Sequence, residues 1–173
     1  KLKDPEAKVV FIGPCAAKKL EASRKSVRSD IDFVLTFEEM MGVFEAKNID
    51  LEAMEEEKEV SEASRDGRNF AIAGGVAEAV VNCIKKMYPD QEIKVESAQG
   101  LRECKKLMTL AKAGKYNGYL LEGMACPGGC VAGAGTLQAI NKSTVAVKQY
   151  ATSAEYQYCC DTDYLKDLEE LGK

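Results

Sequence analysis

Residues 9–19 read V-V-F-I-G-P-C-A-A-K-K, the pattern of a strand that passes through a tight turn into a helix. The β-branched apolar run at 9–12 is typical of a short buried strand. Gly13-Pro14 ends that run, and proline is favoured in the first turn of a helix because it has no backbone N–H to leave unpaired. The sequence therefore predicts a helix over residues 15–25.

The same alternation of strand and helix continues along the chain. Thr36, with Glu39 three residues later, forms a capping-box pattern that predicts a helix start. Further strands are expected at 31–35, 93–96 and 119–121. Further helices are expected at 36–47, 76–87 and 101–113, and another is expected to start near residue 136. A last helix is expected in the acidic tail, where Leu165, Leu168 and Leu171 have helical spacing. Residues 50–69 have the composition of a solvated surface segment.

This alternation predicts an α/β fold in which a parallel β-sheet is flanked by helices. We expect a single domain over residues 1–173, with a helical C-terminal tail. In sheets of this kind, ligands bind beyond the carboxyl ends of the strands. The loops that follow strands are therefore the first candidates for a functional site.

The composition favours a globular protein and excludes several classes of partner. The 173 residues are 46% hydrophobic and 30% charged, which is ordinary for a folded domain. The net charge is −4, and no basic stripe interleaved with aromatic residues indicates a nucleic-acid surface. The apolar runs are far shorter than the ~20 residues that span a bilayer, and no leader pattern opens the chain, so we expect a cytoplasmic protein without membrane contact.

Histidine does not occur in the sequence, whereas cysteine occurs seven times. The lack of histidine excludes Ser-His-Asp and Cys-His catalysis, imidazole-ligated haem and the usual zinc enzymes. An odd number of cysteines in a chain without secretory features argues against a disulfide framework. Metal binding and simple burial remain as roles for these thiols.

Two cysteine-bearing segments lie where a predicted strand passes into a predicted helix. The first is G-P-C-A-A-K-K at 13–19, and the second is E-G-M-A-C-P-G-G-C-V-A-G-A-G at 122–135. A cysteine at a helix start meets unpaired N–H groups and the positive end of the helix dipole, which favour the thiolate. Cys15 is expected in that position, and Lys18 can add an ammonium group on nearly the same face.

Cys126 and Cys130 are four residues apart, so both thiols can face one metal group. The glycines around them let backbone approach a bulky inorganic ligand closely. Zinc bound to several of these cysteines is also compatible with the spacing. A dinucleotide fingerprint starting at Gly133 is excluded, because its third glycine would fall at Gln138.

The other cysteines are weaker candidates. A lone cysteine is more often a small buried apolar residue than a ligand. Cys83 and Cys104 lie on the apolar faces of their predicted helices, which favours core positions for both. The adjacent Cys159 and Cys160 lie in a polar stretch and are left unassigned.

The two segments together resemble the second and third signature motifs of the iron-only (FeFe) hydrogenases, Pro-Cys-x-x-Lys-Lys and Glu-x-Met-Ala-Cys-x-Gly-Gly-Cys. Residues 31–36 (I-D-F-V-L-T) and 70–79 (F-A-I-A-G-G-V-A-E-A) are also similar to family segments, in the family's order. The resemblance covers about residues 7–150. It implies that the chain is the C-terminal portion of the hydrogenase catalytic domain and forms one lobe of that domain.

The resemblance implies a role for each motif residue. Three cysteines would bind irons of a 4Fe-4S cubane: Cys15, Cys126 and Cys130. Cys130 would also bridge to the diiron subcluster that completes the H-cluster, and Lys18 would act in catalysis by hydrogen-bonding a cyanide ligand of the diiron unit. Pro14, Phe70 and Met124 would line the pocket. The implied reaction is the reversible reduction of protons to H2, for which the cofactor supplies the difficult chemistry.

The family's first motif, Thr-Ser-Cys-Cys-Pro, holds the fourth cubane ligand and a proton-shuttling cysteine, and it does not occur in this sequence. The chain alone is therefore expected to be inactive, with the H-cluster missing or incomplete. The implied partners are the missing N-terminal half of the same catalytic domain, a ferredoxin-like electron donor or acceptor, and hydrogenase maturation proteins. Gly13 and Ala134 depart from the family's commoner methionine and glycine, so pocket packing is expected to differ.

Two other functions fit these residues. One is a hydrogenase-like iron–sulfur assembly or carrier protein without a diiron unit. Such relatives also keep a lysine after Pro-Cys and a proline after the first cysteine of the last motif, as Pro127 does here. The other is a structural zinc-binding domain.

Overall fold

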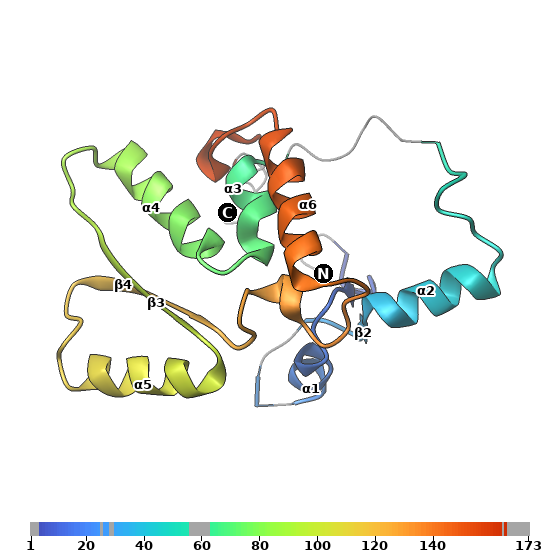
Figure 1. Cartoon of the computed structure of the whole chain (residues 1–173), viewed down its shortest axis with the longest axis horizontal. Helices are drawn as coiled ribbons and strands as arrows, with labels where there is room; N and C mark the ends of the chain where they lie inside the picture. The colour runs from blue at the N-terminus through green and yellow to red at the C-terminus, as the bar shows by residue number, and fades with distance from the viewer. Residues whose placement is uncertain (1–3, 25, 28–29, 56–62, 164, 166–173) are drawn as a thin grey trace. The chain divides into compact units, whose positions relative to one another are not determined.

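The computed structural model describes residues 4–24, 26–27, 30–55, 63–163 and 165 (Figure 1). The chain divides into two compact units. Unit 1 comprises the described residues of 1–60 together with 133–139, and unit 2 comprises those of 61–132 together with 140–173. Within the described residues, no helix is long and apolar enough to span a membrane.

Unit 1 is built on a strand–helix–strand unit followed by a helix. Its elements are β1 (Val10–Ile12), α1 (Ala17–Ser23), β2 (Phe33–Leu35) and α2 (Phe37–Ala46). β1 and β2 pair in parallel with Phe11 opposite Val34, and the N–H of Gly13 extends the pairing to the carbonyl of Leu35 at 3.0 Å. The two predicted strands are confirmed, whereas α1 begins two residues after the predicted start at Cys15.

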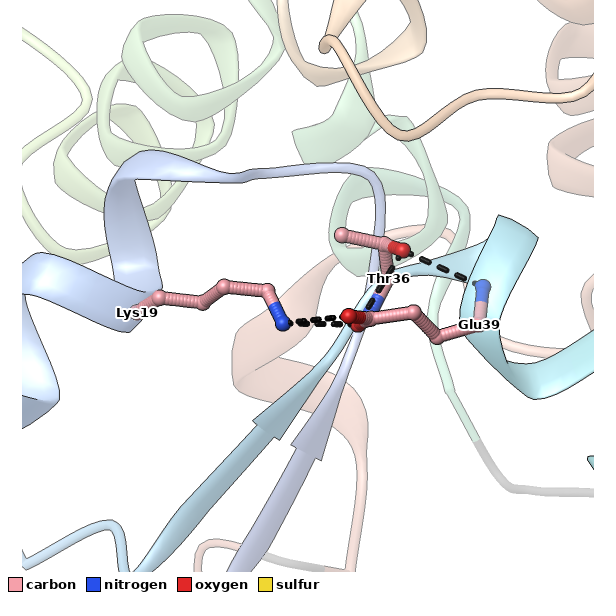
Figure 2. Close-up of polar contacts among 3 residues, drawn as sticks. All are labelled: Lys19, Thr36 and Glu39. Atoms are coloured by element: carbon pink, nitrogen blue, oxygen red, sulfur yellow. Dashed lines mark hydrogen bonds and ion pairs between the residues drawn. The ribbon is translucent and has the colours of Figure 1, made fainter.

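The start of α2 is fixed by the predicted capping box (Figure 2). The Thr36 hydroxyl oxygen accepts the N–H of Glu39 at 3.2 Å, and the Glu39 carboxylate accepts the N–H of Thr36 at 2.8 Å. The Lys19 ammonium group on α1 donates to both Glu39 oxygens at 2.7 Å. This ammonium group, together with the Thr36 N–H, holds the pKa of Glu39 below its usual value, because both favour the carboxylate.

Unit 2 holds a second parallel pair of strands. Its elements are α3 (Arg65–Arg68), η1 (Asn69–Ala71), α4 (Gly75–Met87), β3 (Lys94–Gln99), α5 (Leu101–Lys112), β4 (Tyr119–Met124), η2 (Cys130–Ala132), α6 (Ile140–Thr152) and η3 (Cys159–Asp161). β3 and β4 are in register from Lys94 opposite Tyr119 to Gln99 opposite Met124. Figure 1 shows the pair between α4 and α5. Both strands end at the same edge, and the loop with Cys126 and Cys130 follows the end of β4.

The α/β class with parallel strands is confirmed, and the described strands form two separate two-stranded sheets. α6 begins at Ile140, four residues after the predicted start, because residues 133–139 make turns in unit 1 instead. The surface segment predicted at 50–69 ends earlier than expected. Ser64 and Asp66 are buried, and the Ser64 hydroxyl caps α3 by accepting the N–H of Gly67 at 3.0 Å.

Two parts of the sequence predictions lie outside the described residues. One is most of the predicted acidic helix, including Leu168 and Leu171, and the other is the middle of the surface segment at 56–62. The expectation of a single domain over 1–173 stays a prediction.

Candidate metal-binding site

Cys15 lies in unit 1, in the turn that follows β1. Gly13 and Pro14 separate it from the strand, and the N–H of Lys18 donates to the Cys15 carbonyl at 3.3 Å, which closes the turn before α1. The Cys15 side chain is half-buried, and Pro14 is half-buried beside it. The thiol therefore lies at the carboxyl end of a strand, as predicted.

Lys18 has a partner within its own helix. Its ammonium group donates to the two oxygens of Glu21 at 2.9 and 2.8 Å. Both side chains are more than one-third exposed, and an exposed pair of this kind contributes only about 0–1 kcal/mol. Little free energy is therefore needed to move the Lys18 ammonium group to another acceptor. Glu21 was not among the predicted site residues, although the i,i+3 spacing from Lys18 is a usable signal.

The end of the second cysteine segment returns to unit 1 and packs on Pro14. A Cβ atom added at Gly133 would lie 2.3 Å from the Pro14 carbonyl oxygen, and one added at Gly135 would lie 2.6 Å from the Thr36 Cβ. The N–H of Gly135 donates to the Pro14 carbonyl at 2.9 Å. These two glycines are thus required by close packing within the protein.

Cys126 and Cys130 lie in unit 2, in the loop that follows β4. The N–H of Gly129 donates to the Cys126 carbonyl at 3.0 Å, and Cys130 then opens η2. Gly128 and Gly129 have φ of +99° and +95°, which side-chain-bearing residues rarely adopt. Cys126 is half-buried and Cys130 is exposed. The loop therefore presents both cysteines from a single tight turn.

The cysteine loop packs against the segment that precedes α4. The carbonyl of Gly128 accepts the N–H of Ala73 at 3.1 Å, and a Cβ atom at Gly129 would lie 2.5 Å from the Ala73 nitrogen. On the other side, the Gln99 side-chain oxygen at the end of β3 accepts the N–H of Gly128 at 2.8 Å. The loop is thus held between the end of β3 and the start of α4.

Glu122, the first residue of the second cysteine segment, links β4 to the start of α4. Its carboxylate accepts the N–H of Gly74 at 2.6 Å and the N–H of Ala77 at 3.0 Å. The side chain is buried, with 8% of the residue exposed. A carboxylate at a helix N-terminus pairs N–H groups that have no partner inside the helix. This role was not expected from the sequence, because the two partners are more than 40 residues away along the chain.

Phe70 and Met124 lie in two elements of unit 2, η1 and β4. Phe70 is in η1, which contacts η2, and 44% of it is exposed. Met124 ends β4, and its carbonyl accepts the N–H of Gly100 at 2.8 Å. Both residues therefore belong to the same unit as Cys126 and Cys130, whereas Pro14 and Lys18 belong to unit 1 with Cys15.

Cys104 lies against the strand pair. Its sulfur is 3.5 Å from the Met124 carbonyl oxygen and 3.6 Å from that of Ala98. This packing agrees with the core role expected for Cys104, although its side chain is only half-buried. Within the part of the chain that the structure describes, no group of three or more Cys, His, Asp or Glu side chains has the geometry of a metal site.

The fold of the chain is that of the FeFe-hydrogenases. The solved structure of HydA1, an FeFe-hydrogenase from Chlamydomonas reinhardtii, matches 94% of the chain with a TM-score of 0.65 and 20% sequence identity. The chain spans 58% of that structure. The likeness establishes a shared α/β architecture.

The chain belongs to the family described as "Iron only hydrogenase large subunit, C-terminal domain", whose sequence model matches residues 1–134. The periplasmic [Fe] hydrogenase large subunit of Nitratidesulfovibrio vulgaris is 29% identical over 78% of the chain. Protein NAR1 of Arabidopsis thaliana is 25% identical over 88% of the chain. The chain spans 41% and 42% of these two relatives, less than half of their length.

Proposed function

We propose that the chain is the C-terminal part of an iron-only hydrogenase and supplies three cysteine ligands, Cys15, Cys126 and Cys130, to its iron–sulfur cluster. The observation that carries this proposal is that the family match includes all three cysteines, and that Cys15 and Cys126 each follow the end of a parallel strand within three residues. Loops that follow parallel strands are where α/β sheets bind their ligands.

The donor set fits an iron–sulfur cluster in part. All seven cysteines are thiols in the structure, and the sequence has no histidine to compete as a ligand. A cubane cluster is held by four thiolates, so three from this chain leave one position to be filled from elsewhere. This shortfall favours a longer full-length protein, in which a preceding segment supplies the fourth ligand.

Chain connectivity supports a shared role for the two cysteine segments. Cys130 is only three residues from Gly133, and Gly133 packs on Pro14, the residue before Cys15. The segment that follows Cys130 thus leads to a glycine that packs beside Pro14, the residue before Cys15.

The remaining motif residues would bind and shield the cofactor. When bound, the H-cluster would supply the reversible reduction of protons to H2. The Lys18 ammonium group would leave Glu21 and donate a hydrogen bond to a cyanide ligand. Pro14, Phe70 and Met124 would exclude water from the pocket, which strengthens electrostatic interactions inside it.

The missing N-terminal half of the catalytic domain is the first partner that we propose. β1 and β2 form a two-stranded sheet that contacts α1, and so small a sheet depends on cover over its apolar side chains. Apolar side chains on this pair are substantially exposed: Val10 at 47%, Ile12 at 46% and Phe33 at 59%. A segment of the full-length protein that covers them would stabilise unit 1. A ferredoxin-like redox partner, maturation proteins and a cytoplasmic location stay predictions.

The proposal predicts different behaviour for the chain and the full-length gene product. The purified chain should be colourless or contain labile iron, whereas the matured full-length protein should show the infrared bands of cyanide and carbonyl ligands and evolve H2. A stable, stoichiometric H-cluster and hydrogen evolution from the 173-residue chain alone would overturn the division of ligands proposed here.

A second candidate is a non-catalytic iron–sulfur assembly or carrier protein. The match to protein NAR1, a relative not named as a hydrogenase, covers 88% of the chain, and Pro127 follows Cys126 as in such relatives. The full-length protein would then bind iron and sulfide without cyanide or carbonyl bands. For a structural zinc domain, metal analysis would instead find zinc and no iron.

A further inference from the structure

Cys83 and Cys159 bring their sulfur atoms within 3.2 Å of each other. Cys83 lies on α4 and Cys159 opens η3, and both belong to unit 2. Both side chains are half-buried, as is that of the neighbouring Cys160. Cys83 was expected in the core, and Cys159 and Cys160 were left unassigned because they lie in a polar stretch. Cys83 and Cys159 are 76 residues apart along the chain.

The segment that carries Cys159 is held against neighbouring helices by several other contacts. The Lys86 ammonium group pairs with the Asp161 carboxylate and lies 5.9 Å from the centre of the Tyr158 ring. The carbonyl of Tyr156 accepts the N–H of Arg65 at the start of α3 at 2.8 Å. The approach of the two sulfurs is therefore supported on both sides of Cys159 and does not depend on the thiols alone.

The surroundings of Cys83 and Cys160 disfavour their thiolate forms. Burial raises the pKa of Cys83, with a further increase from the hydrogen bond to Cys159. Burial and the neighbouring Cys83 also raise the pKa of Cys160. A disulfide carries no charge, so it is compatible with this partly buried position, where the charged form of Cys83 is disfavoured.

A metal ion is a poorer explanation of the pair than a disulfide. No group of three or more possible ligands with metal-site geometry occurs among the described residues, although Cys160 is adjacent. A disulfide needs the sulfurs at about 2.05 Å. Closing the remaining gap requires a movement of roughly 1 Å, which is small for a short segment on the surface of a helix.

We propose that Cys83 and Cys159 form a reversible disulfide by exchange with a low-molecular-weight disulfide such as oxidised glutathione. One thiolate attacks the small disulfide, forms a mixed disulfide and releases one small thiol. The second protein thiol then attacks the mixed disulfide and releases the other. The protein pair loses two electrons and two protons, and the small disulfide becomes two thiols. Since no motif cysteine takes part, this inference is independent of the proposed hydrogenase function.

The test uses the metal-free 173-residue chain, handled without oxygen and treated with oxidised glutathione. Thiols are then blocked with a maleimide, and the partner of each cysteine is mapped by peptide mass spectrometry. We expect Cys83 to be recovered linked to Cys159 at least roughly tenfold more often than to any other cysteine. The link should disappear after reduction, and the preference should be lost when exchange is carried out in urea.

Three variants serve as controls. Cys160→Ser should keep the Cys83–Cys159 link, whereas Cys83→Ser and Cys159→Ser should leave glutathione on the remaining partner. The proposal is overturned if Cys83 in the wild-type chain is recovered mainly as a glutathione adduct, linked mainly to Cys160, or unmodified while other cysteines react. It is equally overturned if the chain as purified holds one zinc or iron ion that Cys83→Ser loses and Cys126→Ser keeps.

Discussion

The backbone N–H of Gly135 donates to the carbonyl oxygen of Pro14 at 2.9 Å. Pro14 precedes Cys15, and Gly135 ends the segment that contains Cys126 and Cys130. The first cysteine segment therefore holds the end of the second within unit 1, and small residues are needed at the point of contact. This relationship can be tested before any cofactor is considered.

Gly133→Ala should destabilise the chain, because the new Cβ would lie 2.3 Å from the Pro14 carbonyl oxygen. We expect a loss of about 1–3 kcal/mol, typical of an overpacked site, measured by urea unfolding followed by circular dichroism. Gly42→Ala is the matched control, since nothing lies within 4 Å of its added Cβ. Because Gly42 lies in the exposed middle of α2, Gly42→Ala should raise the free energy of unfolding by about 0.5–1 kcal/mol. Equal stability of the two variants would contradict the close packing on Pro14.

Glu122→Gln should destabilise unit 2, because an amide can accept only one of the two N–H groups, from Gly74 and Ala77, that the carboxylate accepts. A buried N–H without an acceptor costs about 1–3 kcal/mol. Glu103→Gln is the control, since Glu103 is exposed and forms only a long surface ion pair, with its Oε2 3.9 Å from the Lys106 Nζ. It should change the free energy of unfolding by no more than about 0.5 kcal/mol. Similar losses for both variants would argue against the role of Glu122 at the helix start.

Glu39 should make the stability of unit 1 depend on pH. Its pKa is lowered from 4.5 by Lys19 and the Thr36 N–H, so the carboxylate stabilises the folded state above that value and the benefit is lost as pH falls through the lower, folded-state pKa. The difference in unfolding free energy between wild type and Glu39→Gln should thus be largest at neutral pH and shrink in acid. Glu38→Gln, which keeps the contacts in Figure 2, should show a smaller change. A constant difference for Glu39→Gln across pH would refute this assignment.

Lys18 should matter to activity and little to stability. In the matured full-length protein, Lys18→Met should lower H2 evolution by about 10²–10³-fold, the usual cost of removing one donor at a reacting centre. It should also shift an infrared cyanide band. Glu21→Gln releases the Lys18 ammonium group from its ion pair and should change the rate by less than about fivefold. Full activity of Lys18→Met would show that Lys18 does not act at the site.

Local sequence signals predicted most of the secondary structure. The apolar run before Gly13-Pro14, the capping box at Thr36 and the helical spacing at 76–87 each depend on neighbouring residues, and each corresponds to an element of the structure. The start of α6 was predicted four residues early, because Gly133 and Gly135 pack on residues from the other end of the chain.

The contacts around the candidate site were harder to predict, because they join distant parts of the sequence. Nothing near Glu122 indicates that its carboxylate reaches α4. The approach of Cys83 to Cys159 likewise depends on how the segment after α6 packs. The candidate cysteine ligands were found through their motif spacing, which reflects chemistry and is visible in sequence alone.

The central claim is that Cys15, Cys126 and Cys130 bind one iron–sulfur cluster, and the iron content of cysteine variants tests it most directly. The measurement is iron per protein after anaerobic reconstitution of the full-length gene product, for each of the three Cys→Ser variants and for Cys104→Ser as the control. We predict that each of the three variants loses most of the cluster iron bound by the wild type, whereas Cys104→Ser retains it. Wild-type iron content in all three variants would contradict the account.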